Sequence, residues 1–214
     1  MENENPINEL QTDEAEKIDI TETSEDLTKL DSFEEGAEEN VAAVPEYEPK
    51  NKYEKLLYRV YKDENLSEML KISSYAIVVL TIYAFLSCLI TTAAENLIGA
   101  IELILITGVP FVLVSVLRYA VNAPRPYELI EFYEKKPKDK TGRSFPSRHV
   151  FSVFVIGVAL IPTNILLGIT LLFLGIALAA IRVLMGIHFI RDVLAGAAIG
   201  VLSGVIGLLI LHFV

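Results

Sequence analysis

The chain has 214 residues, of which 52% are hydrophobic, and it combines a mean hydropathy of +0.46 with a formal net charge of −10. Residues 1–48 hold 17 acidic residues against two lysines, a net charge of −15, whereas the remaining residues carry a net charge of +5. Apolar runs long enough to cross a bilayer argue against a soluble globular protein. The single cysteine, Cys88, argues against a disulfide scaffold, and the acidic N-terminus lacks a signal-peptide pattern.

The first 48 residues differ in composition from the rest of the chain. They mix acidic, amide and hydroxyl side chains with few apolar ones, so they cannot bury enough surface to offset the entropy lost on folding. We predict that residues 1–48 are a disordered acidic tail, which is solvated. The sharper alternative is that the tail masks a basic site in the core.

A short basic segment follows the tail. Within residues 52–62, the apolar side chains recur at the spacing of one helix face: Tyr53, Leu56, Leu57, Val60 and Tyr61. A basic amphipathic helix just before a membrane span suits the lipid interface, so residues 49–72 are predicted to form an interfacial helix and a linker. The alternative is an ordinary helix that packs on the protein.

Five apolar segments complete the chain, at about 73–93, 97–121, 147–161, 165–185 and 192–213. Isolated strands cannot cross lipid, so we predict an all-α integral membrane bundle of about five transmembrane helices. The third segment is marginal because a span needs about 20 residues. The fifth carries glycines at a spacing of four, which lets helices approach closely: Gly196, Gly200 and Gly204.

Three clusters of polar residues stand at the ends of these spans and, with five spans, all on one membrane face. They read Arg118-x6-Arg125-Pro126, then Ser144-Phe145-Pro146-Ser147-Arg148-His149, then Arg182-x5-His188-x3-Asp192. Ionisable residues near a bilayer are expensive to bury and are functional candidates by default. A single arginine could be a snorkelling anchor, but this gathering on one face favours a site.

The residue types in these clusters point to anion chemistry. Arginine presents a planar charged fork that matches phosphate oxygens, and helix N-termini near Ser147 and Asp192 add backbone N–H groups. His188 and Asp192 are four residues apart, so on a helical turn they face each other, and the carboxylate would set the imidazole tautomer. His149 could donate a proton to a leaving group.

Metal binding is the main competing use of two histidines and an acid. The core has no His-Glu-x-x-His motif, no cysteine pair and no carboxylate cluster, and the surrounding arginines would repel a cation. We therefore expect no metal and no cofactor.

The three clusters resemble the signature of the type 2 phosphatidic acid phosphatase (PAP2) superfamily, which also includes vanadium haloperoxidases. That signature reads Lys-x6-Arg-Pro, then Pro-Ser-Gly-His, then Ser-Arg-x5-His-x3-Asp. The resemblance marks residues 73–214 as a PAP2-like domain. It implies that His188 attacks phosphorus and forms a phosphohistidine, that Asp192 orients it, and that His149 protonates the leaving oxygen. It also implies phosphate contacts from Arg118, Arg125, Arg182 and Ser147.

The chain departs from this signature in four ways. Arg118 replaces Lys, Arg148 replaces Gly, and Ile181 replaces the Ser before the last arginine. Five spans are predicted where family members often have six. The Arg148 side chain can add a further phosphate contact. Because the two histidines and the aspartate are retained, an active enzyme is expected.

The resemblance implies a metal-independent phosphatase in the bacterial plasma membrane, acting on lipid phosphate or diphosphate monoesters, either phosphatidate-like or undecaprenyl diphosphate. The expected partners are this substrate and membrane lipids, without nucleic acid, and the oligomeric state stays open. The alternative is a non-catalytic anion-binding membrane protein on the same fold. Transport is a weaker idea, and a haloperoxidase is disfavoured because those relatives are soluble.

The family resemblance and the distribution of basic residues imply different membrane faces for the site. Bacterial relatives in the family generally carry it on the outer face. Eleven basic residues other than the candidate arginines and Arg191, however, all lie on the site face, and Lys/Arg bias normally places that face in the cytoplasm. These residues are Lys50, Lys52, Lys55, Arg59, Lys62, Lys71, Lys135, Lys136, Lys138, Lys140 and Arg143. We predict a cytoplasmic site.

Overall fold

The computed structural model describes residues 47–133 and 141–212, and within these ranges it contains helices and no strand. The helices are α2 (Lys52–Lys62), α3 (Glu64–Glu95), α4 (Leu97–Val121), α5 (Pro126–Leu129), α6 (Arg148–Leu160), α7 (Ile165–Leu184) and α8 (Ile190–His212). The all-α prediction is confirmed. The predicted disordered tail lies almost wholly outside the described residues and stays a prediction.

Four helical stretches are long and apolar enough to cross a membrane: Glu64–Glu95, Leu97–Leu129, Ile165–Leu184 and Ile190–Ile210. The third predicted span, at about 147–161, is the 13-residue helix α6. At 1.5 Å per residue it is about 20 Å long, less than the roughly 30 Å of a hydrocarbon core.

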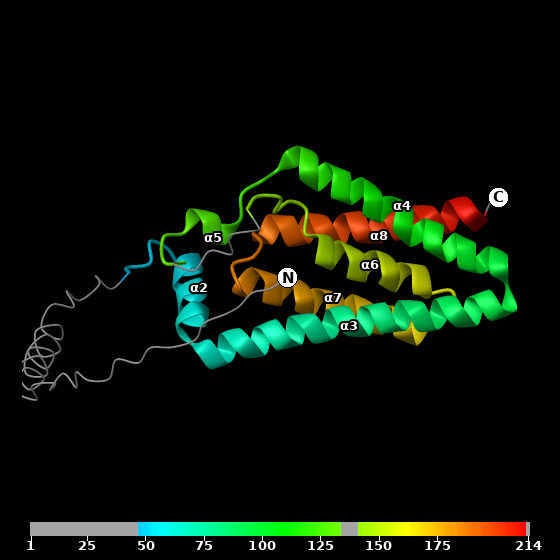
Figure 1. Cartoon of the computed structure of the whole chain (residues 1–214), viewed down its shortest axis with the longest axis horizontal. Helices are drawn as coiled ribbons and strands as arrows, with labels where there is room; N and C mark the ends of the chain where they lie inside the picture. The colour runs from blue at the N-terminus through cyan, green and yellow to red at the C-terminus, as the bar shows by residue number, and fades with distance from the viewer. Residues whose placement is uncertain (1–46, 134–140, 213–214) are drawn as a thin grey trace, which may run out of the picture. The chain divides into compact units, whose positions relative to one another are not determined.

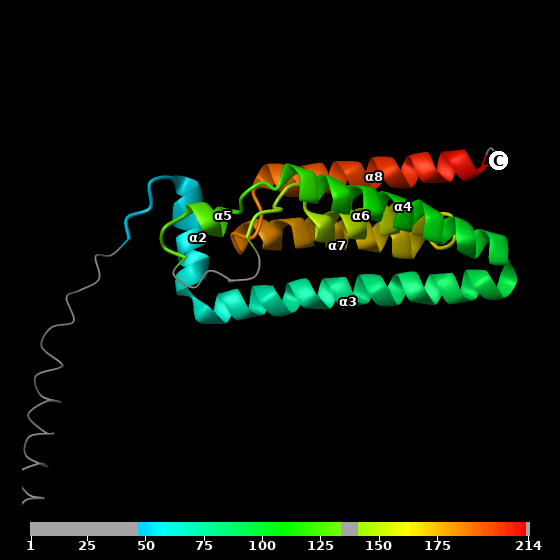
Figure 2. The same ribbon diagram turned by 45° about the horizontal axis from the view of Figure 1, so that its top comes forward.

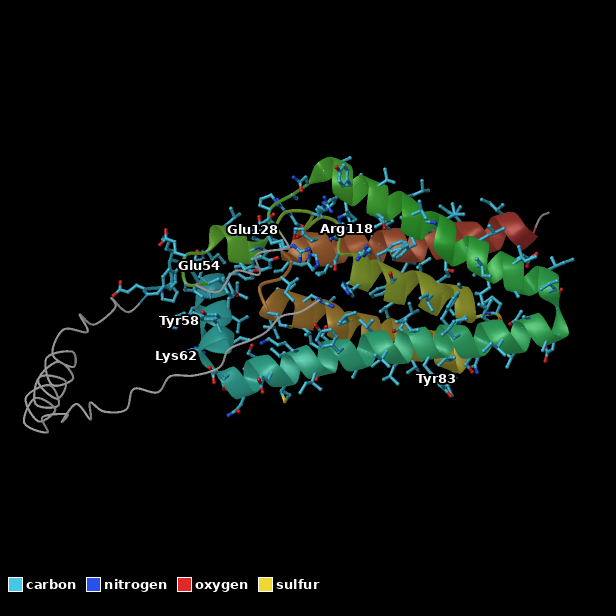
Figure 3. All side chains as sticks on the ribbon, viewed as in Figure 1. Glu54, Tyr58, Lys62, Tyr83, Arg118 and Glu128 are labelled. Carbon is cyan, nitrogen blue, oxygen red and sulfur yellow. The ribbon has the colours of Figure 1, made fainter. Side chains whose placement is uncertain are left out.

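Helix α6 lies in the middle of the bundle, with α4 and α8 on one side and α3 and α7 on the other (Figures 1 and 2). Its side chains are the most completely buried of the core, including Val150, Phe151, Val153 and Leu160. The outer helices instead expose apolar side chains, and Tyr83 of α3 points away from the bundle (Figure 3). A short third helix is tolerated because its longer neighbours surround it.

The glycines of α8 allow it to lie directly against α6. A Cβ atom added at Gly196 would lie 2.6 Å from the carbonyl oxygen of Ser147, and one at Gly200 would lie 2.7 Å from that of Phe151. These distances are shorter than any real contact, so larger side chains would push the helices apart. The predicted close packing is confirmed, and it brings the start of α6 beside the start of α8.

Asparagine caps shape the tight turns at the far end of the bundle. The Asn96 side chain accepts a hydrogen bond from the Ile98 backbone N–H at 3.0 Å, and Asn164 does the same for Leu167 at 3.0 Å. Such caps satisfy amide groups that the first turn of a helix leaves unpaired. The described parts of the longer, polar connections lie at the opposite end of the bundle.

Helix α2 coincides with the predicted amphipathic segment and packs on the protein along part of its apolar face. Leu57 and Val60 are buried, and the ring centroids of Tyr58 and Tyr61 lie 5.3 and 5.4 Å from that of Phe132. The contacts therefore support the packing alternative for this face. That α2 also contacts the lipid interface through its exposed Leu56 stays a prediction.

Candidate active site

The three predicted clusters converge at one end of the bundle, where they line a cavity of about 680 Å³. Six of the eight predicted site residues line it: Arg118, Arg125, Arg148, His149, Arg182 and His188. They come from α4, the segment before α5, α6, α7 and the loop between α7 and α8. Arg118 and Glu128 mark this end of the molecule (Figure 3). The other two predicted residues, Ser147 and Asp192, are fully buried.

His188 is buried at 2% exposure, and a serine hydroxyl lies between it and Asp192. Ser144 Oγ is 2.5 Å from Asp192 Oδ2 and 3.2 Å from His188 Nδ1, whereas the direct distance from Nδ1 to Oδ2 is 3.8 Å. A carboxylate only accepts, so Ser144 donates to Asp192 and its oxygen can accept from Nδ1–H. Nε2 is then the nitrogen with a free lone pair.

The loop that carries His188 turns sharply at Gly186, whose φ of +64° is accessible to glycine without strain. Tyr133 packs so closely against Gly186 that a Cβ atom there would overlap its hydroxyl. Burial lowers the pKa of His188 below its ordinary range, and the charges of Arg125 and Arg118 lower it further, while Asp192 opposes them. The imidazole is therefore neutral near pH 7 and able to act as a nucleophile.

Asp192 also anchors the backbone around the site. Its Oδ2 accepts from the Phe189 backbone N–H at 3.0 Å, which closes the first turn of α8. Its own carbonyl oxygen accepts from the Ser147 backbone N–H at 2.8 Å, which joins the start of α8 to the start of α6. The Ser147 amide is thus engaged within the protein, which removes one of the backbone donors expected to hold phosphate.

Two of the arginines also hold the loop in front of α6. Arg118 Nη1 donates to the carbonyl oxygens of Pro146 and Ser144, and Arg125 Nε donates to that of Gly142 at 3.0 Å. The Gly142 N–H in turn donates to a Glu128 carboxylate oxygen at 2.6 Å. The cationic groups are consequently held in place before any ligand binds, which favours tight recognition of an anion.

Three buried polar atoms of the site have no hydrogen-bond partner within the described part of the chain. They are Arg182 Nε, Ser147 Oγ and Asp192 Oδ1, the last of which lies 3.5 Å from Arg191 Nε in an ion pair. A buried donor without a partner costs about 1–3 kcal/mol, more when it is charged. Because Arg182 also lines the cavity, a phosphate oxygen placed there would satisfy its donor.

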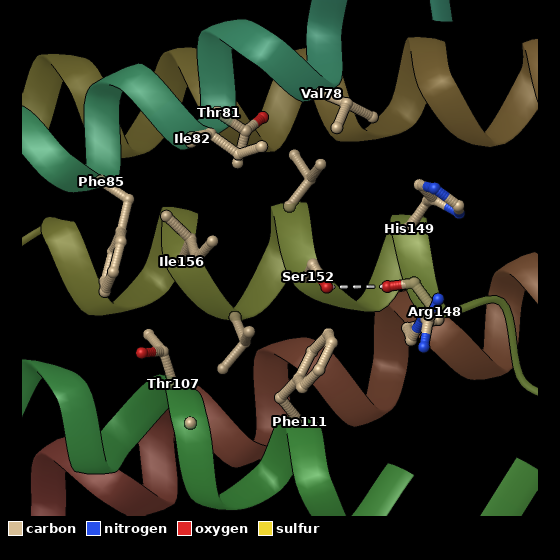
Figure 4. Close-up of a pocket in the computed structure, with 13 residues that line it drawn as sticks. Val78, Thr81, Ile82, Phe85, Thr107, Phe111, Arg148, His149, Ser152 and Ile156 are labelled. Carbon is tan, nitrogen blue, oxygen red and sulfur yellow. Dashed lines mark hydrogen bonds between the residues drawn. The ribbon is translucent and has the colours of Figure 1, made fainter. Parts of the chain in front are cut away.

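A second, largely apolar cavity of about 420 Å³ continues from the first along α6. Arg148 and His149 line both cavities. Figure 4 shows His149 and Arg148 at one end of this groove, Ile82 and Phe85 of α3 on one side, and Phe111 of α4 on the other. The polar cavity thus suits a charged headgroup, and the adjoining apolar cavity suits a hydrocarbon chain.

Sequence reasoning missed three residues of the site. Ser144 was part of a quoted motif but had no role, whereas it bridges His188 and Asp192. Lys71 and Arg143 were treated as topology signals, whereas both line the cavity. A signal existed for Lys71, since it is the single basic residue of α3. Among the described residues, no group of three or more His, Cys, Asp or Glu side chains could hold a metal ion.

The chain is similar to a known protein family and to two solved structures. Residues 99–213 match the model of the PAP2 superfamily. The crystal structure of Aquifex aeolicus LpxE is similar, with 26% identity, a TM-score of 0.55, and coverage of 72% of this chain and 93% of that one. The transmembrane PAP2 type phosphatidylglycerolphosphate phosphatase from Bacillus subtilis has 18% identity, a TM-score of 0.48, and coverage of 76% and 93%. No curated protein matches.

The matched region contains all three clusters, from the helix that carries Arg118 to the helix that begins beside His188. Together with the four membrane-spanning stretches, the match identifies an integral membrane protein and supports a membrane phosphatase. By its sequence and its fold, this chain belongs to the PAP2 superfamily.

Proposed function

We propose that the protein is a metal-independent lipid phosphatase of the bacterial plasma membrane, which works through a phosphohistidine intermediate. The observation that carries this proposal is the buried His188–Ser144–Asp192 arrangement at the wall of an arginine-lined cavity. Simple anion binding needs the arginines alone. An imidazole whose Nδ1 side is held by a serine and a carboxylate is the arrangement expected of an activated nucleophile.

The first step is attack on phosphorus. His188 Nε2 forms an N–P bond while the bond from phosphorus to the lipid oxygen breaks. Arg118, Arg125 and Arg182 surround the transferring group and stabilise the charge spread over its equatorial oxygens. Asp192, through Ser144, stabilises the positive charge that develops on the imidazole.

His149 is placed to protonate the leaving oxygen. It is the histidine that lines both the polar cavity and the apolar groove, so it lies where the headgroup meets the chain. A substrate whose chain occupies the groove would put its leaving oxygen on this side. Water then attacks the phosphohistidine, with His149 as base, and releases inorganic phosphate.

The test is phosphate release from a short-chain phosphatidate and from farnesyl diphosphate, with the full chain in detergent and excess EDTA present. We expect turnover with chelator, and a loss of at least about 10²-fold in His149→Ala and more in His188→Ala. His212→Ala, a histidine at the far end of α8, is the matched control.

An acid-labile phosphoenzyme should accumulate in the wild type on rapid quenching and be missing in His188→Ala. Full activity in His188→Ala would refute the nucleophile assignment. Loss of activity on chelation that a divalent ion restores would refute the metal-independent mechanism. An inactive wild type that still binds lipid phosphates would favour the non-catalytic anion-binding alternative.

A further inference from the structure

The loop that carries His188 turns back on the end of α7. The backbone N–H groups of Ile187 and His188 both donate to the carbonyl oxygen of Arg182, at 3.1 and 3.3 Å. The turn that makes this possible is at Gly186, two residues before His188, with a φ of +64°. The position of the proposed nucleophile therefore depends on how firmly this one turn is held.

The segment after Arg125 holds the same turn. The Tyr127 backbone N–H donates to the Gly186 carbonyl oxygen at 3.3 Å, and the Tyr133 side chain packs directly against Gly186. Tyr133 is buried, at 9% exposure, and it does not line the polar cavity. Its ring therefore supports the turn without occupying the place of the substrate.

Helix α2 in turn supports Tyr133. The ring centroid of Tyr61 lies 5.2 Å from that of Tyr133, in an edge-to-face contact, and 5.4 Å from that of Phe132. The rings of Phe132 and Tyr133 also contact each other, with centroids 4.3 Å apart. Aromatic pairs prefer a few relative orientations, so a change in one ring disturbs its neighbours. Figures 1 and 2 show α2 beside α5 at the end of the bundle that carries the site.

Helix α2 also lies within electrostatic range of the catalytic acid. Burial raises the pKa of Tyr53, on this helix, to about 12, and the negative charge of Asp192 contributes to the rise. Helix α2 precedes residues 99–213, which match the PAP2 model, so family membership assigns this helix no role. Its contact with the loop of the nucleophile is a feature of this chain.

We propose that Tyr133 and Tyr61 are positioning residues for His188: α2 holds the Tyr133 ring against the Gly186 turn, and the turn keeps the imidazole at the wall of the cavity. This inference rests on the proposed phosphatase function and extends its site to a helix outside the matched residues. Neither tyrosine lines the polar cavity. A misplacement of about 1 Å can lower a rate on the order of 10²-fold, so support behind the nucleophile is enough for a large effect.

The test replaces the Tyr133 ring but keeps an apolar side chain. In Tyr133→Leu, kcat for a short-chain phosphatidate should fall about tenfold or more, because His188 is less firmly held. KM should change little, because the residues that line the cavity are unchanged. The rate of phosphoenzyme formation on rapid quenching should fall by the same factor. Tyr133→Phe should retain most of the activity, since the ring atoms Cζ and Cε2 also approach Gly186.

NMR of ¹⁵N-labelled histidine provides a readout that needs no substrate. Burial lowers the pKa of His188, so a loosened turn that admits water should raise its titration midpoint toward the ordinary value of about 6.5. Tyr133→Leu should show this rise, and Tyr133→Phe should not. If the ring served only general stability, Tyr133→Leu would lower the melting temperature but leave the midpoint and kcat of the folded enzyme unchanged, and the positioning role would be refuted.

Tyr61→Leu tests the contribution of α2. It should lower kcat, and the double variant with Tyr133→Leu should lose less than the product of the two separate effects, because both act through one contact. Tyr83→Leu is the matched control, since Tyr83 is an exposed tyrosine of α3 that points away from the bundle (Figure 3). It should leave kcat unchanged.

The outcomes separate the two proposals. An active wild type whose kcat and histidine midpoint are the same in Tyr133→Leu would refute the positioning role while the phosphatase proposal stands. Effects of Tyr61→Leu and Tyr133→Leu that simply multiply would show that α2 does not act through Tyr133. A wild type that releases no phosphate from any lipid phosphate would overturn both proposals.

Discussion

Ser144 is the residue that makes His188 and Asp192 one unit. The two side chains are 3.8 Å apart, too far for a direct hydrogen bond, and the serine hydroxyl is within reach of both. Ser144→Ala should lower kcat by about 10- to 100-fold, the equivalent of one hydrogen bond to a charged group. KM should change little, because Ser144 lies behind His188 and outside the cavity lining. Steady-state kinetics in detergent separates the two parameters.

Ser144→Thr, which keeps the hydroxyl, should recover part of the activity, and the phosphoenzyme should form more slowly in Ser144→Ala than in the wild type. Ser87→Ala removes an exposed hydroxyl from α3 and serves as the control. A Ser144→Ala enzyme with unchanged kcat would show that His188 and Asp192 couple without the bridge.

The pKa of His188 sets the acid limit of activity. Attack requires the neutral imidazole, which predominates above its pKa, and burial with nearby arginines lowers that pKa below the ordinary value of about 6.5. His188 should therefore still be mostly neutral at pH 6.5, and it should become protonated only when the pH falls below its lowered pKa. Titration of ¹⁵N-labelled histidine by NMR, assigned with His188→Gln, measures this without interference from substrate ionisation. A midpoint above 6.5 would contradict the predicted direction.

The sequence predicted which residues gather at the site better than what each one contacts. His188 and His149 lie where span-end motifs placed them, because motif spacing and helix ends are local properties. Ser144 precedes His188 by 44 positions and Asp192 by 48 positions, so no local sequence pattern contains the bridge between them. Arg118 likewise binds loop carbonyl oxygens that are near only in the folded chain.

Among the helices, the contact between α6 and α8 positions the start of both and therefore the site. Gly200→Ala would place a Cβ atom 2.7 Å from a backbone oxygen and 2.8 Å from Phe154 Cβ, neither of which can rotate away. We expect a loss of about 1–3 kcal/mol in the free energy of unfolding, seen as a lower melting temperature in detergent. Activity should fall as well, because α6 carries His149 and α8 carries Asp192.

Gly108→Ala in α4 is the matched control, since a Cβ atom there meets nothing within 4 Å. Alanine is the better helix former, so this variant should be as stable as the wild type or slightly more stable. If Gly200→Ala were as stable as Gly108→Ala, the two helices would not be in the close contact described.

Hydropathy predicted most helix bounds because membrane spans are long and uniform. The apolar run alone starts the first span at about residue 73, whereas α3 begins at Glu64, where the Asp63 side chain accepts a hydrogen bond from Leu66 N–H at 3.0 Å. It also could not explain the short α6, whose length is tolerated because its neighbours bury it. Both features depend on polar caps or on packing rather than on mean hydropathy.

At the scale of the whole molecule, the arrangement of the helices bears on which membrane face carries the site. The helices α3, α4, α6, α7 and α8 alternate in direction, so the three clusters meet at one end and the asparagine-capped turns at the other (Figures 1 and 2). The cavity now accounts for Lys71 and Arg143, which reduces the eleven basic residues of the topology argument to nine. Lys135, Lys136, Lys138 and Lys140 lie outside the described residues.

The described basic residues that remain, from Lys50 to Lys62, all belong to the segment before α3 at the site end, and no basic residue lies at the opposite turns. Short-loop Lys and Arg bias places such a face in the cytoplasm, and acidic residues contribute little to the rule. We therefore predict a cytoplasmic site, although the family resemblance implies the outer face. Lys55→Cys on α2 and Glu95→Cys at the far turn, each with Cys88→Ala, report the two faces because both positions are exposed.

A membrane-impermeant maleimide added to intact cells should label Glu95→Cys and spare Lys55→Cys until the membrane is permeabilised. The opposite pattern would place the site outside and show that the chain overrides its charge bias. A cytoplasmic site would restrict the enzyme to lipid phosphates of the inner leaflet, because a charged headgroup does not cross the hydrocarbon core unaided. Topology would then limit the substrates of this protein as strictly as the arginines of its cavity do.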